Sequence, residues 1–214
     1  PGEAKEDLKI INDLGKALGL DWNYNHASEV FNEMSKVMPS LNNISWERVE
    51  KEDSVTYPCD DKNLPGNEIV FSQNFPTSSG LAKIVPTDLI SPHELPDQNF
   101  PFVLTTGRLL EHWHTGAMTR RSNTLDNIEP EAIVNMNRLD MKNLKLEPGN
   151  KVQVKTRRGS IELSVRQDTE LPKGMIFIPF CFSEAAANKL TNPQLDPFGK
   201  IPEFKYCAAN IEAC

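Results

Sequence analysis

The sequence predicts a mainly β protein with flanking helices, in which a small helical segment precedes a barrel of short strands. Three observations support this fold class: apolar residues at helical spacing near the N-terminus, a central stretch rich in turn-forming residues, and many short apolar runs in the C-terminal half. Many short strands with only two small helices among them favour a barrel over a sandwich. We expect three segments, which are residues 1–50, 51–98 and 99–214.

Composition and charge limit the classes of protein to which this chain can belong. The chain has 214 residues, of which 38% are hydrophobic and 25% charged, as is typical of a soluble globular protein. Its apolar runs are far shorter than the roughly 20 residues that cross a bilayer, and no signal peptide is visible, so we expect no membrane span. A formal net charge of -7 argues against nucleic-acid binding, which needs clustered cations. The cysteines lack CxxC spacing and predict free thiols in a cytoplasmic protein.

The first segment, residues 1–50, is predicted to be helical. Leu8, Ile11 and Leu14 recur at the spacing of one helix face, and Gly19 is a natural stop. Helices this short bury little apolar area alone, so we expect them to form the edge of a larger domain. The predicted helices cover residues 8–18, 28–38 and 45–50.

The second segment, residues 51–98, is predicted to be a connection. The stretches YPCDDKNLPGNE and SPHELPDQ are rich in Pro, Gly, Asn and Asp, which favour turns and loops. The short apolar runs Glu68–Phe71 and Ala82–Val85 are interpreted as isolated strands within this connection.

The third segment, residues 99–214, is predicted to form the barrel. Val152 and Val154 alternate with polar residues, and the turn RRGS joins them to the next alternating run as a hairpin. Asn137 is a natural N-cap for one short helix, and Ser183 is expected to cap another. The predicted strands cover residues 101–106, 131–137, 150–156, 159–165, 174–180 and 205–211.

The densest group of candidate functional residues is the stretch GRLLEHWHTGAMTRRS, which follows the first predicted strand of the barrel. Its histidines, His112 and His114, form an HxH pair that can ligate zinc or iron, but no further ligand follows at a suitable spacing. Gly107 lets the backbone approach a ligand closely, while Thr106 and Arg108 offer donors to phosphate oxygens. The residues therefore favour an anionic ligand, with metal ligation and hydrogen-bonded loop histidines as alternatives.

A second group of candidates lies near the C-terminus. The amide of Asn188 can pair with a purine or pterin edge, and Lys205 can place a charge on a phosphate. The residues alone favour a surface lysine and a helix-end asparagine without a ligand. No pairing is visible in sequence for the remaining acid–base or nucleophile candidates, which are Glu111, Asp126, Glu184 and Cys181.

Three stretches together resemble the C-terminal part of the catalytic subunit of molybdenum- or tungsten-dependent formate dehydrogenases. They are FPFVLTTGRLLEHWHTGAMTRRS, IPFCFSEAAANKLTNPQLDPFGKIPEFKYCAANIE and the helical opening DLKIINDLGKALGLDWNYNHASEVFNEM, so the resemblance covers nearly the whole chain. It implies that residues 99–214 form a double-psi β-barrel. It also implies a ligand, molybdopterin guanine dinucleotide, two copies of which hold one Mo or W atom in the full enzyme.

The resemblance implies cofactor contacts in two clusters and no catalytic or metal-ligating residue within this chain. One cluster follows the first strand of the barrel and the other lies near the C-terminus. Together the implied cofactor-binding residues are Thr106, Gly107, Arg108, His112, Trp113, His114, Asn188, Phe204 and Lys205.

The resemblance also implies motifs of the full subunit that no residues of this sequence match. In the family, an iron–sulfur motif, a Cys or selenocysteine metal ligand and a substrate-binding His and Arg precede this region. We therefore expect a fragment that does not oxidise formate alone and acts with the remainder of the catalytic subunit and with electron-transfer subunits. The alternatives are a separately encoded cofactor-binding subunit and a related oxidoreductase such as nitrate reductase.

Overall fold

The computed structural model describes residues 2–214 and separates the chain into two compact units, residues 1–87 and 88–214. Pro1, which begins the predicted helical segment, lies outside the described residues. The predicted segment boundaries at residues 50 and 98 stay a prediction. Every helix in the described part of the chain falls short of the length and apolarity that a membrane crossing requires.

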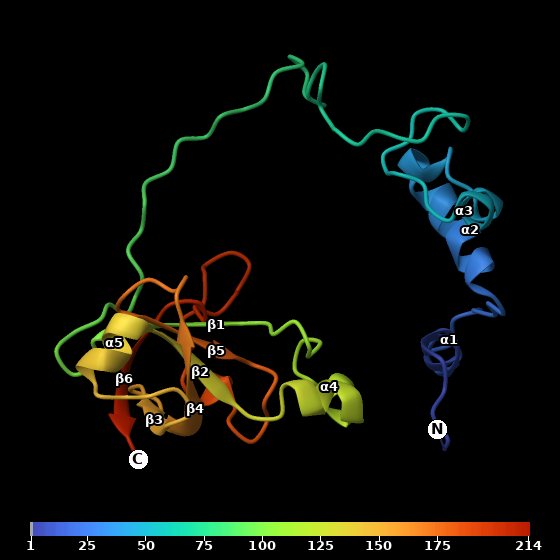
Figure 1. Ribbon diagram of the computed structural model, residues 1–214. Coiled ribbons are helices and arrows are strands. Elements are labelled where there is room, and N and C mark those ends of the chain that lie inside the picture. Colours follow the sequence, from blue (N-terminus) through green and yellow to red (C-terminus); the bar gives the residue numbers. More distant parts are fainter. Residues whose placement is uncertain (1) are drawn as a thin grey trace. The chain divides into compact units, whose positions relative to one another are not determined.

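The structure contains five α-helices, three short 3-10 helices (η1–η3) and six strands, which Figure 1 labels along the chain where there is room. The helices are α1 Asp7–Ala17, α2 Ala27–Val37, η1 Pro39–Leu41, α3 Trp46–Glu52, η2 Thr119–Arg121, α4 Asn123–Ile128, α5 Arg138–Asn143 and η3 Ala187–Lys189. The strands are β1 Phe102–Gly107, β2 Ile133–Asn137, β3 Lys151–Lys155, β4 Ser160–Asp168, β5 Met175–Pro179 and β6 Cys207–Ala213.

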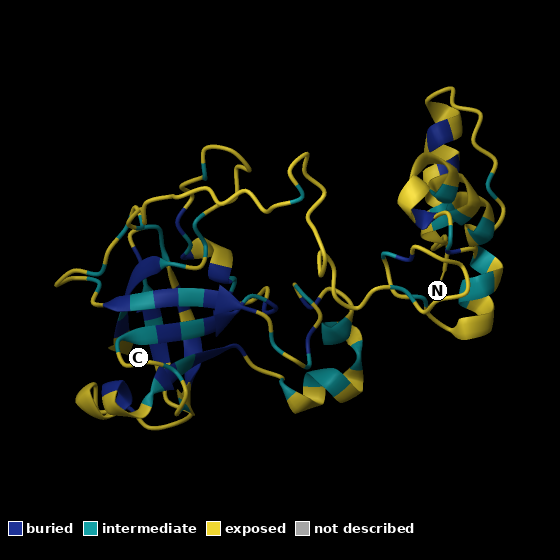
Figure 2. Ribbon diagram, turned by 90° about the horizontal axis from the view of Figure 1, so that it is seen from above, coloured by how far each residue is buried: buried dark blue, intermediate teal, exposed yellow. Residues whose placement is uncertain are grey.

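The first unit is helical and has a small interior. Helices α1, α2 and α3 confirm the helices predicted from apolar spacing. Ser45 caps α3, because its hydroxyl oxygen accepts the Arg48 N–H at 3.1 Å. The buried hydrophobic cluster comprises Leu41, Ile44 and Cys59, and most of the remaining ribbon is exposed or intermediate (Figure 2). Short helices thus bury little area here, as their length predicts.

The two strands predicted in the connection are wrong. The structure gives Glu68–Phe71 and Ala82–Val85 turns, bends and irregular backbone instead. A short, mostly apolar run forms a strand only where a neighbouring strand accepts its backbone hydrogen bonds, and the described residues place none beside these runs. The Ile84 side chain is accordingly 90% exposed.

The second unit is a closed barrel of six strands in the order β1-β5-β2-β4-β3-β6. β1 runs parallel to β5, and β2 runs parallel to β4, whereas the other four neighbouring pairs are antiparallel. Helices α4 and α5 lie on opposite sides of the barrel (Figure 1). The observed barrel confirms the predicted fold class.

Aliphatic side chains from all six strands fill the barrel, and its strands are the most buried part of the chain (Figure 2). Each fully buried aliphatic side chain contributes about 1.5–3 kcal/mol of transfer free energy, so this interior is the main source of stability in the unit. The strand side chains that are at most 1% exposed include Leu104, Val134, Met136, Val152, Val154, Leu163, Ile176 and Ile178.

The pairing pattern of the barrel has a two-fold topological symmetry. Exchanging β1 with β4, β2 with β5 and β3 with β6 turns the parallel pair β1–β5 into the parallel pair β4–β2. The same exchange turns the antiparallel pair β1–β6 into β4–β3 and leaves β2–β5 and β3–β6 unchanged. Two sets of loops in the barrel are therefore built from equivalent connections.

The helix predicted after Ser183 is wrong in extent. The chain forms only the single 3-10 turn η3, and the Ser183 hydroxyl contacts the Glu184 carboxylate at 3.5 Å instead of capping backbone groups. Ala185 and Ala187 are 5% and 2% exposed and belong to the barrel core. Packing against the barrel thus overrides the helix propensity of the alanine run.

The predicted helix after β2 is confirmed as α5, with Asn137 as its N-cap. The Asn137 side-chain oxygen accepts the Leu139 N–H at 2.8 Å. Asp140 is 5% exposed, and its carboxylate accepts the Gly174 N–H at 2.6 Å. One buried carboxylate therefore ties α5 to the turn that precedes β5.

We expect Asp140→Ala to lower the free energy of unfolding by about 1–3 kcal/mol, because it leaves the Gly174 N–H without a partner. Urea denaturation followed by tryptophan fluorescence measures the change. Asp140→Asn keeps an acceptor oxygen and is the control, with a smaller loss. Equal losses for the two variants would show that the hydrogen bond does not stabilise this turn.

Candidate functional site

Three loops meet at one end of the barrel. Because β1 and β5 are parallel, their carboxyl ends reach the same edge, where Gly107 pairs with Pro179. β6 is antiparallel to β1, with Cys207 opposite Leu104, so the residues just before β6 lie at this end as well. The loops are residues 108–122 after β1, 180–190 after β5 and 203–206 before β6.

The end of β1 is bonded directly to the loop before β6. The Thr106 hydroxyl donates to the Phe204 carbonyl oxygen at 3.1 Å, and the Lys205 ammonium donates to the Thr106 carbonyl oxygen. The same ammonium lies 5.4 Å from the centre of the Phe204 ring. The structure thus joins members of the two predicted clusters that are almost 100 positions apart in sequence.

Gly107 occupies a position that has no room for a side chain. An added Cβ would lie 2.5 Å from Cε2 of Phe177 and 3.8 Å from Nζ of Lys205. Gly107 is buried, and the Phe177 ring fills the space that a side chain would take, with the Lys205 ammonium beside it. The sequence did not single out Phe177 as a site residue, although alternation along β5 places its side chain on the other face of the strand from Ile176 and Ile178.

Arg108, Trp113 and His114 form an exposed group on the loop after β1. Nη2 of Arg108 lies 3.3 Å from Nε2 of His114, whose ring packs edge-on against the Trp113 ring at 4.8 Å. The Trp113 side chain is 61% exposed, and Arg108 makes no ion pair with a carboxylate in the described residues. The loop therefore presents a cation, an imidazole and an indole to a ligand.

His112 is enclosed, unlike its neighbours. Its side chain is 1% exposed, with Nε2 2.8 Å from the Glu129 carbonyl oxygen and Nδ1 3.3 Å from the Thr119 hydroxyl. A carbonyl oxygen only accepts, so the Nε2 nitrogen carries the proton. The ring also packs edge-on against Phe182 at 5.8 Å. His112 consequently anchors the loop after β1 and does not face outward.

Asn188 lies in η3 within the loop after β5, at the same end of the barrel. The residue is exposed, and its carbonyl oxygen accepts the Thr191 hydroxyl at 3.3 Å. Its side-chain amide has no hydrogen bond among residues 2–214, and the residue makes no hydrogen bond with the other predicted site residues. The amide is therefore open to solvent.

Arg120 joins the loop after β1 to the loop after β5. Its guanidinium donates to the carboxylates of Asp126 and Glu184, the latter at 2.9 Å, and lies 4.7 Å above the Phe182 ring. The sequence showed no partner for Asp126 or Glu184, and the structure corrects this by pairing both with Arg120. Partial burial alone would raise the pKa of Glu184, but hydrogen bonds from its own backbone N–H and from Arg120 hold that pKa below its usual value. These carboxylates therefore act as ionised structural partners.

Gly116 allows the same two loops to pack against each other. It has a φ of +72°, and an added Cβ would lie 2.6 Å from Cγ of Arg120 and 2.7 Å from the Cys181 carbonyl oxygen. Only glycine fits both the left-handed backbone and the space. The buried Cys181 beside it is a poor nucleophile, because burial raises the pKa of its thiol to about 11.

Metal ligation by the HxH pair has no geometric support. His112 uses both ring nitrogens for hydrogen bonds within the chain. Within residues 2–214, no group of three or more His, Cys, Asp or Glu side chains is arranged to hold a metal ion. The exposed surface at this end is instead cationic and aromatic.

Comparison with known proteins identifies similar chains. Residues 102–208 match the family model of the molydopterin dinucleotide binding domain, a span that begins with β1 and ends within β6. The chain is 44% identical to the F420-dependent formate dehydrogenase subunit alpha of Methanocaldococcus jannaschii, over 99% of this chain and 32% of that protein. It is 31% identical to the assimilatory nitrate reductase catalytic subunit of Bacillus subtilis, over 99% of this chain and 31% of that protein.

A solved structure has the same fold. Acetylene hydratase from Pelobacter acetylenicus matches with a TM-score of 0.70 and 19% sequence identity, over 100% of this chain and 33% of that chain. At this identity the match is evidence for the fold alone. The chain spans about a third of the length of the curated relatives that it matches.

We expect Arg120→Gln to lower the free energy of unfolding by about 1–2 kcal/mol, because it removes two ion pairs and a cation–π contact. The Glu184 pKa is lowered in the folded state, so its pairing stabilises the fold above its ordinary pKa of 4.5. That stabilisation is lost as the pH falls from there through the lowered pKa. Urea denaturation at a series of pH values should show the difference from wild type shrinking in that window.

The matched control for this variant is Arg121→Gln, which removes the exposed neighbouring arginine. Arg121 makes no ion pair in the described part of the chain, so we expect a change within about 0.5 kcal/mol. A loss for Arg120→Gln that stays constant down to pH 2.5 or so would contradict the role of Glu184.

We expect iodoacetamide to modify Cys214 rapidly and Cys181 slowly in the folded protein. Cys214 is exposed, whereas Cys181 is buried and its pKa is raised to about 11. At about pH 8 only about one Cys181 thiol in a thousand is ionised. Peptide mass spectrometry over a time course measures both rates, with the urea-unfolded protein as control. Equal rates in the folded protein would contradict the packing of the loop after β5.

Proposed function

We propose, because this chain belongs to the molydopterin dinucleotide binding domain family, that its barrel binds molybdopterin guanine dinucleotide as part of a formate dehydrogenase catalytic subunit. The substrate of that enzyme is formate, which it oxidises to carbon dioxide. Support for formate comes from the 44% identity to a formate dehydrogenase alpha subunit, against 31% to a nitrate reductase. The proposal gives this chain the cofactor-binding task.

The observation that carries the proposal is the pair of exposed cations, Arg108 and Lys205, at the end of β1. An anionic pyrophosphate needs cations that can donate hydrogen bonds to its oxygens. Gly107 has no room for a side chain, Nζ of Lys205 lies 3.8 Å from the position of an added Cβ, and Arg108 follows directly. These residues fit a dinucleotide phosphate, with the Arg108 fork suited to two phosphate oxygens.

The aromatic and amide groups around this position suit the ring systems of the cofactor. Trp113 and His114 offer exposed ring faces and edges, and the Asn188 amide is open to pair with a purine or pterin edge. Phe204 holds the Lys205 ammonium near the end of β1. We assign His112 a positioning task, because its enclosed ring anchors the loop that carries its neighbours.

When bound, the cofactor supplies the metal centre for the two-electron oxidation of formate. The residues of this chain bind the dinucleotide, orient it and keep water from its phosphates. We place the metal ligand, the iron–sulfur clusters and the substrate-binding side chains in other parts of a longer protein. This placement is supported by the relatives, which are about three times as long as the matched region.

We further propose electron-transfer subunits as partners and the cytoplasm as the location. The four free cysteines fit a reducing compartment. The identity of 31% to a nitrate reductase keeps nitrate reduction as the second candidate function, and a separately encoded cofactor-binding subunit remains the alternative organisation. Assays of the native complex with formate and with nitrate distinguish the two substrates, and the mass of the native polypeptide distinguishes the two organisations.

We expect Arg108→Ala to weaken cofactor retention roughly tenfold, because it removes a charge-assisted contact to a phosphate. The measurement is pterin and Mo or W content per polypeptide after extensive desalting of the native enzyme. Arg121→Ala is the control, since this exposed arginine lies in η2 further along the same loop. Unchanged pterin and metal content in Arg108→Ala would refute the assigned site.

A further inference from the structure

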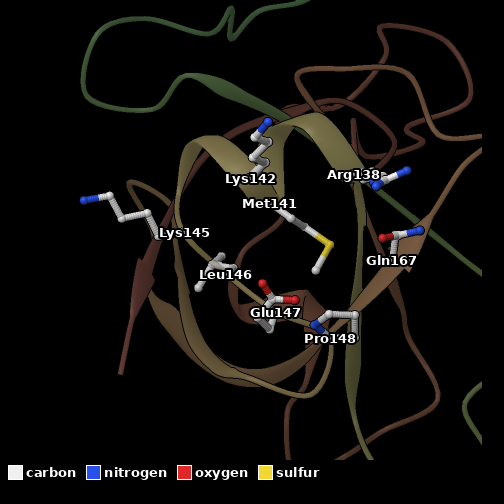
Figure 3. Close-up of a pocket in the computed structure, with 8 residues that line it drawn as sticks. All are labelled: Arg138, Met141, Lys142, Lys145, Leu146, Glu147, Pro148 and Gln167. Carbon is white, nitrogen blue, oxygen red and sulfur yellow. The ribbon is translucent and has the colours of Figure 1, made fainter.

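A second set of loops in the barrel surrounds a hollow that the proposed function does not use. Its volume is about 520 Å³, and its walls come from α5, the turn after α5 and the end of β4 (Figure 3). The residues that line it include Arg138, Met141, Lys142, Lys145, Glu147 and Gln167.

This hollow is the topological counterpart of the candidate functional site. Under the exchange of β1 with β4, β2 with β5 and β3 with β6, the loop after β5 corresponds to α5 after β2. The end of β1 corresponds likewise to the end of β4, and the loop before β6 to the turn before β3. Both surfaces are therefore built from the same three kinds of connection.

The counterpart of Gly107 is an aspartate, so the hollow is not a second dinucleotide site. Gly107 pairs with Pro179 at the end of one parallel pair, and Asp168 pairs with Asn137 at the end of the other. The Asp168 carboxylate accepts the N–H of Glu170 at 2.9 Å and so closes its own turn. A carboxylate at this position repels a phosphate.

Three cations surround the hollow without acidic partners. Arg138, Lys142 and Lys145 make no ion pair with any carboxylate in residues 2–214, whereas in the same unit Arg157 makes two and Arg166 makes one. Figure 3 shows the three cationic side chains pointing outward around the rim in different directions. In a chain of net charge -7, this rim is a local site of attraction for carboxylates.

The centre of the hollow holds one carboxylate and two enclosed apolar side chains. Figure 3 shows Met141, Leu146 and Glu147 at the centre, and Met141 and Leu146 are 3% and 5% exposed, so this chain already covers them. The exposed Glu147 carboxylate favours acidic groups at the rim over acidic groups at the centre. On α5, the Leu139 side chain is 57% exposed and is available for apolar contact. The surface therefore offers cations at its rim and one exposed apolar side chain.

Lys145 ends α5 in a left-handed conformation. Its φ is +57°, in the region where the residue after a helix is usually Gly or Asn. The Lys145 N–H donates to the Lys142 carbonyl oxygen at 3.1 Å, and the Leu146 N–H donates to the Met141 carbonyl oxygen at 2.9 Å. This helix stop fixes the turn that carries the Lys145 side chain at the rim (Figure 3).

We propose that this surface, made by α5 and the turn before β3, docks an acidic segment of a partner protein. Carboxylates of the segment pair with Arg138, Lys142 and Lys145, and one apolar side chain of the segment packs on the exposed Leu139. The surface is separate from the loops of the proposed cofactor site, so docking leaves that site accessible.

The test uses a fluorescein-labelled acidic peptide, DELFDE, and its neutral counterpart, SQLFSQ, with the full chain in fluorescence anisotropy. We expect the acidic peptide to bind at least about tenfold more tightly than the neutral one at about 50 mM salt, and this preference to vanish at about 500 mM. The variant Arg138→Gln/Lys142→Gln/Lys145→Gly should weaken acidic-peptide binding about tenfold. Glycine at position 145 relieves the backbone strain, so the variant keeps its fold.

A control variant with the same charge change is Lys36→Gln/Lys51→Gln/Lys62→Gln, whose lysines are exposed in the first unit and make no ion pairs among the described residues. It should change binding less than about twofold. Leu139→Ser should weaken both peptides about threefold, because it removes apolar contact area.

Several outcomes would overturn the proposal. They are no binding of the acidic peptide at a concentration of about 1 mM, equal binding of both peptides, or equal effects of the two triple variants. Inorganic pyrophosphate is the last probe. If it displaces the acidic peptide from the wild type with an affinity that the rim variant loses, the surface is a small-anion site and not a docking surface.

Discussion

The pairing of β1 is the constraint on which the rest of the barrel unit depends. β1 has β5 on one side in parallel and β6 on the other in antiparallel orientation. The parallel partner brings the loop after β5 to the end of β1, and the antiparallel partner brings the loop before β6 to the same place. Thr106 and Lys205 then lie within hydrogen-bonding reach across a separation of 99 residues.

Within that frame, a few enclosed polar groups determine the shape of the loop after β1. His112 bonds to the Glu129 carbonyl oxygen, and Arg120 bridges Asp126 and Glu184. Because these anchors use the inward-facing side chains, the intervening Trp113 is directed to solvent. The loop is thus divided between residues that hold it and residues that are free to contact a ligand.

The two topologically equivalent loop sets of the barrel differ because their key residues differ. At one, Gly107 packs against Phe177 and the Lys205 ammonium lies beside it. At the other, Asp168 closes a turn and α5 carries a rim of cations. The same topology therefore presents two surfaces of different chemistry, because their side chains differ.

Much of this architecture is readable in the sequence, because strands and caps depend on local pattern. Alternation of Val152 and Val154 predicted β3, and Asn137 predicted the start of α5. The apolar run at Ala82–Val85 was misinterpreted for the same reason, since local pattern carries no information on whether a partner strand exists. Likewise, the alanines after Ser183 favour a helix locally but pack into the barrel.

The sequence by itself determined the fold class, the family resemblance and the chemical types of the candidate site residues. Only the tertiary structure decided which of them are exposed and which are enclosed. His112 and His114 are two positions apart, yet one is 1% exposed and anchors the loop while the other lies beside Arg108. The partners of Arg120 and the contact of Phe177 with Gly107 come from distant strands and loops. Such contacts depend on barrel closure, which no local pattern of residues specifies.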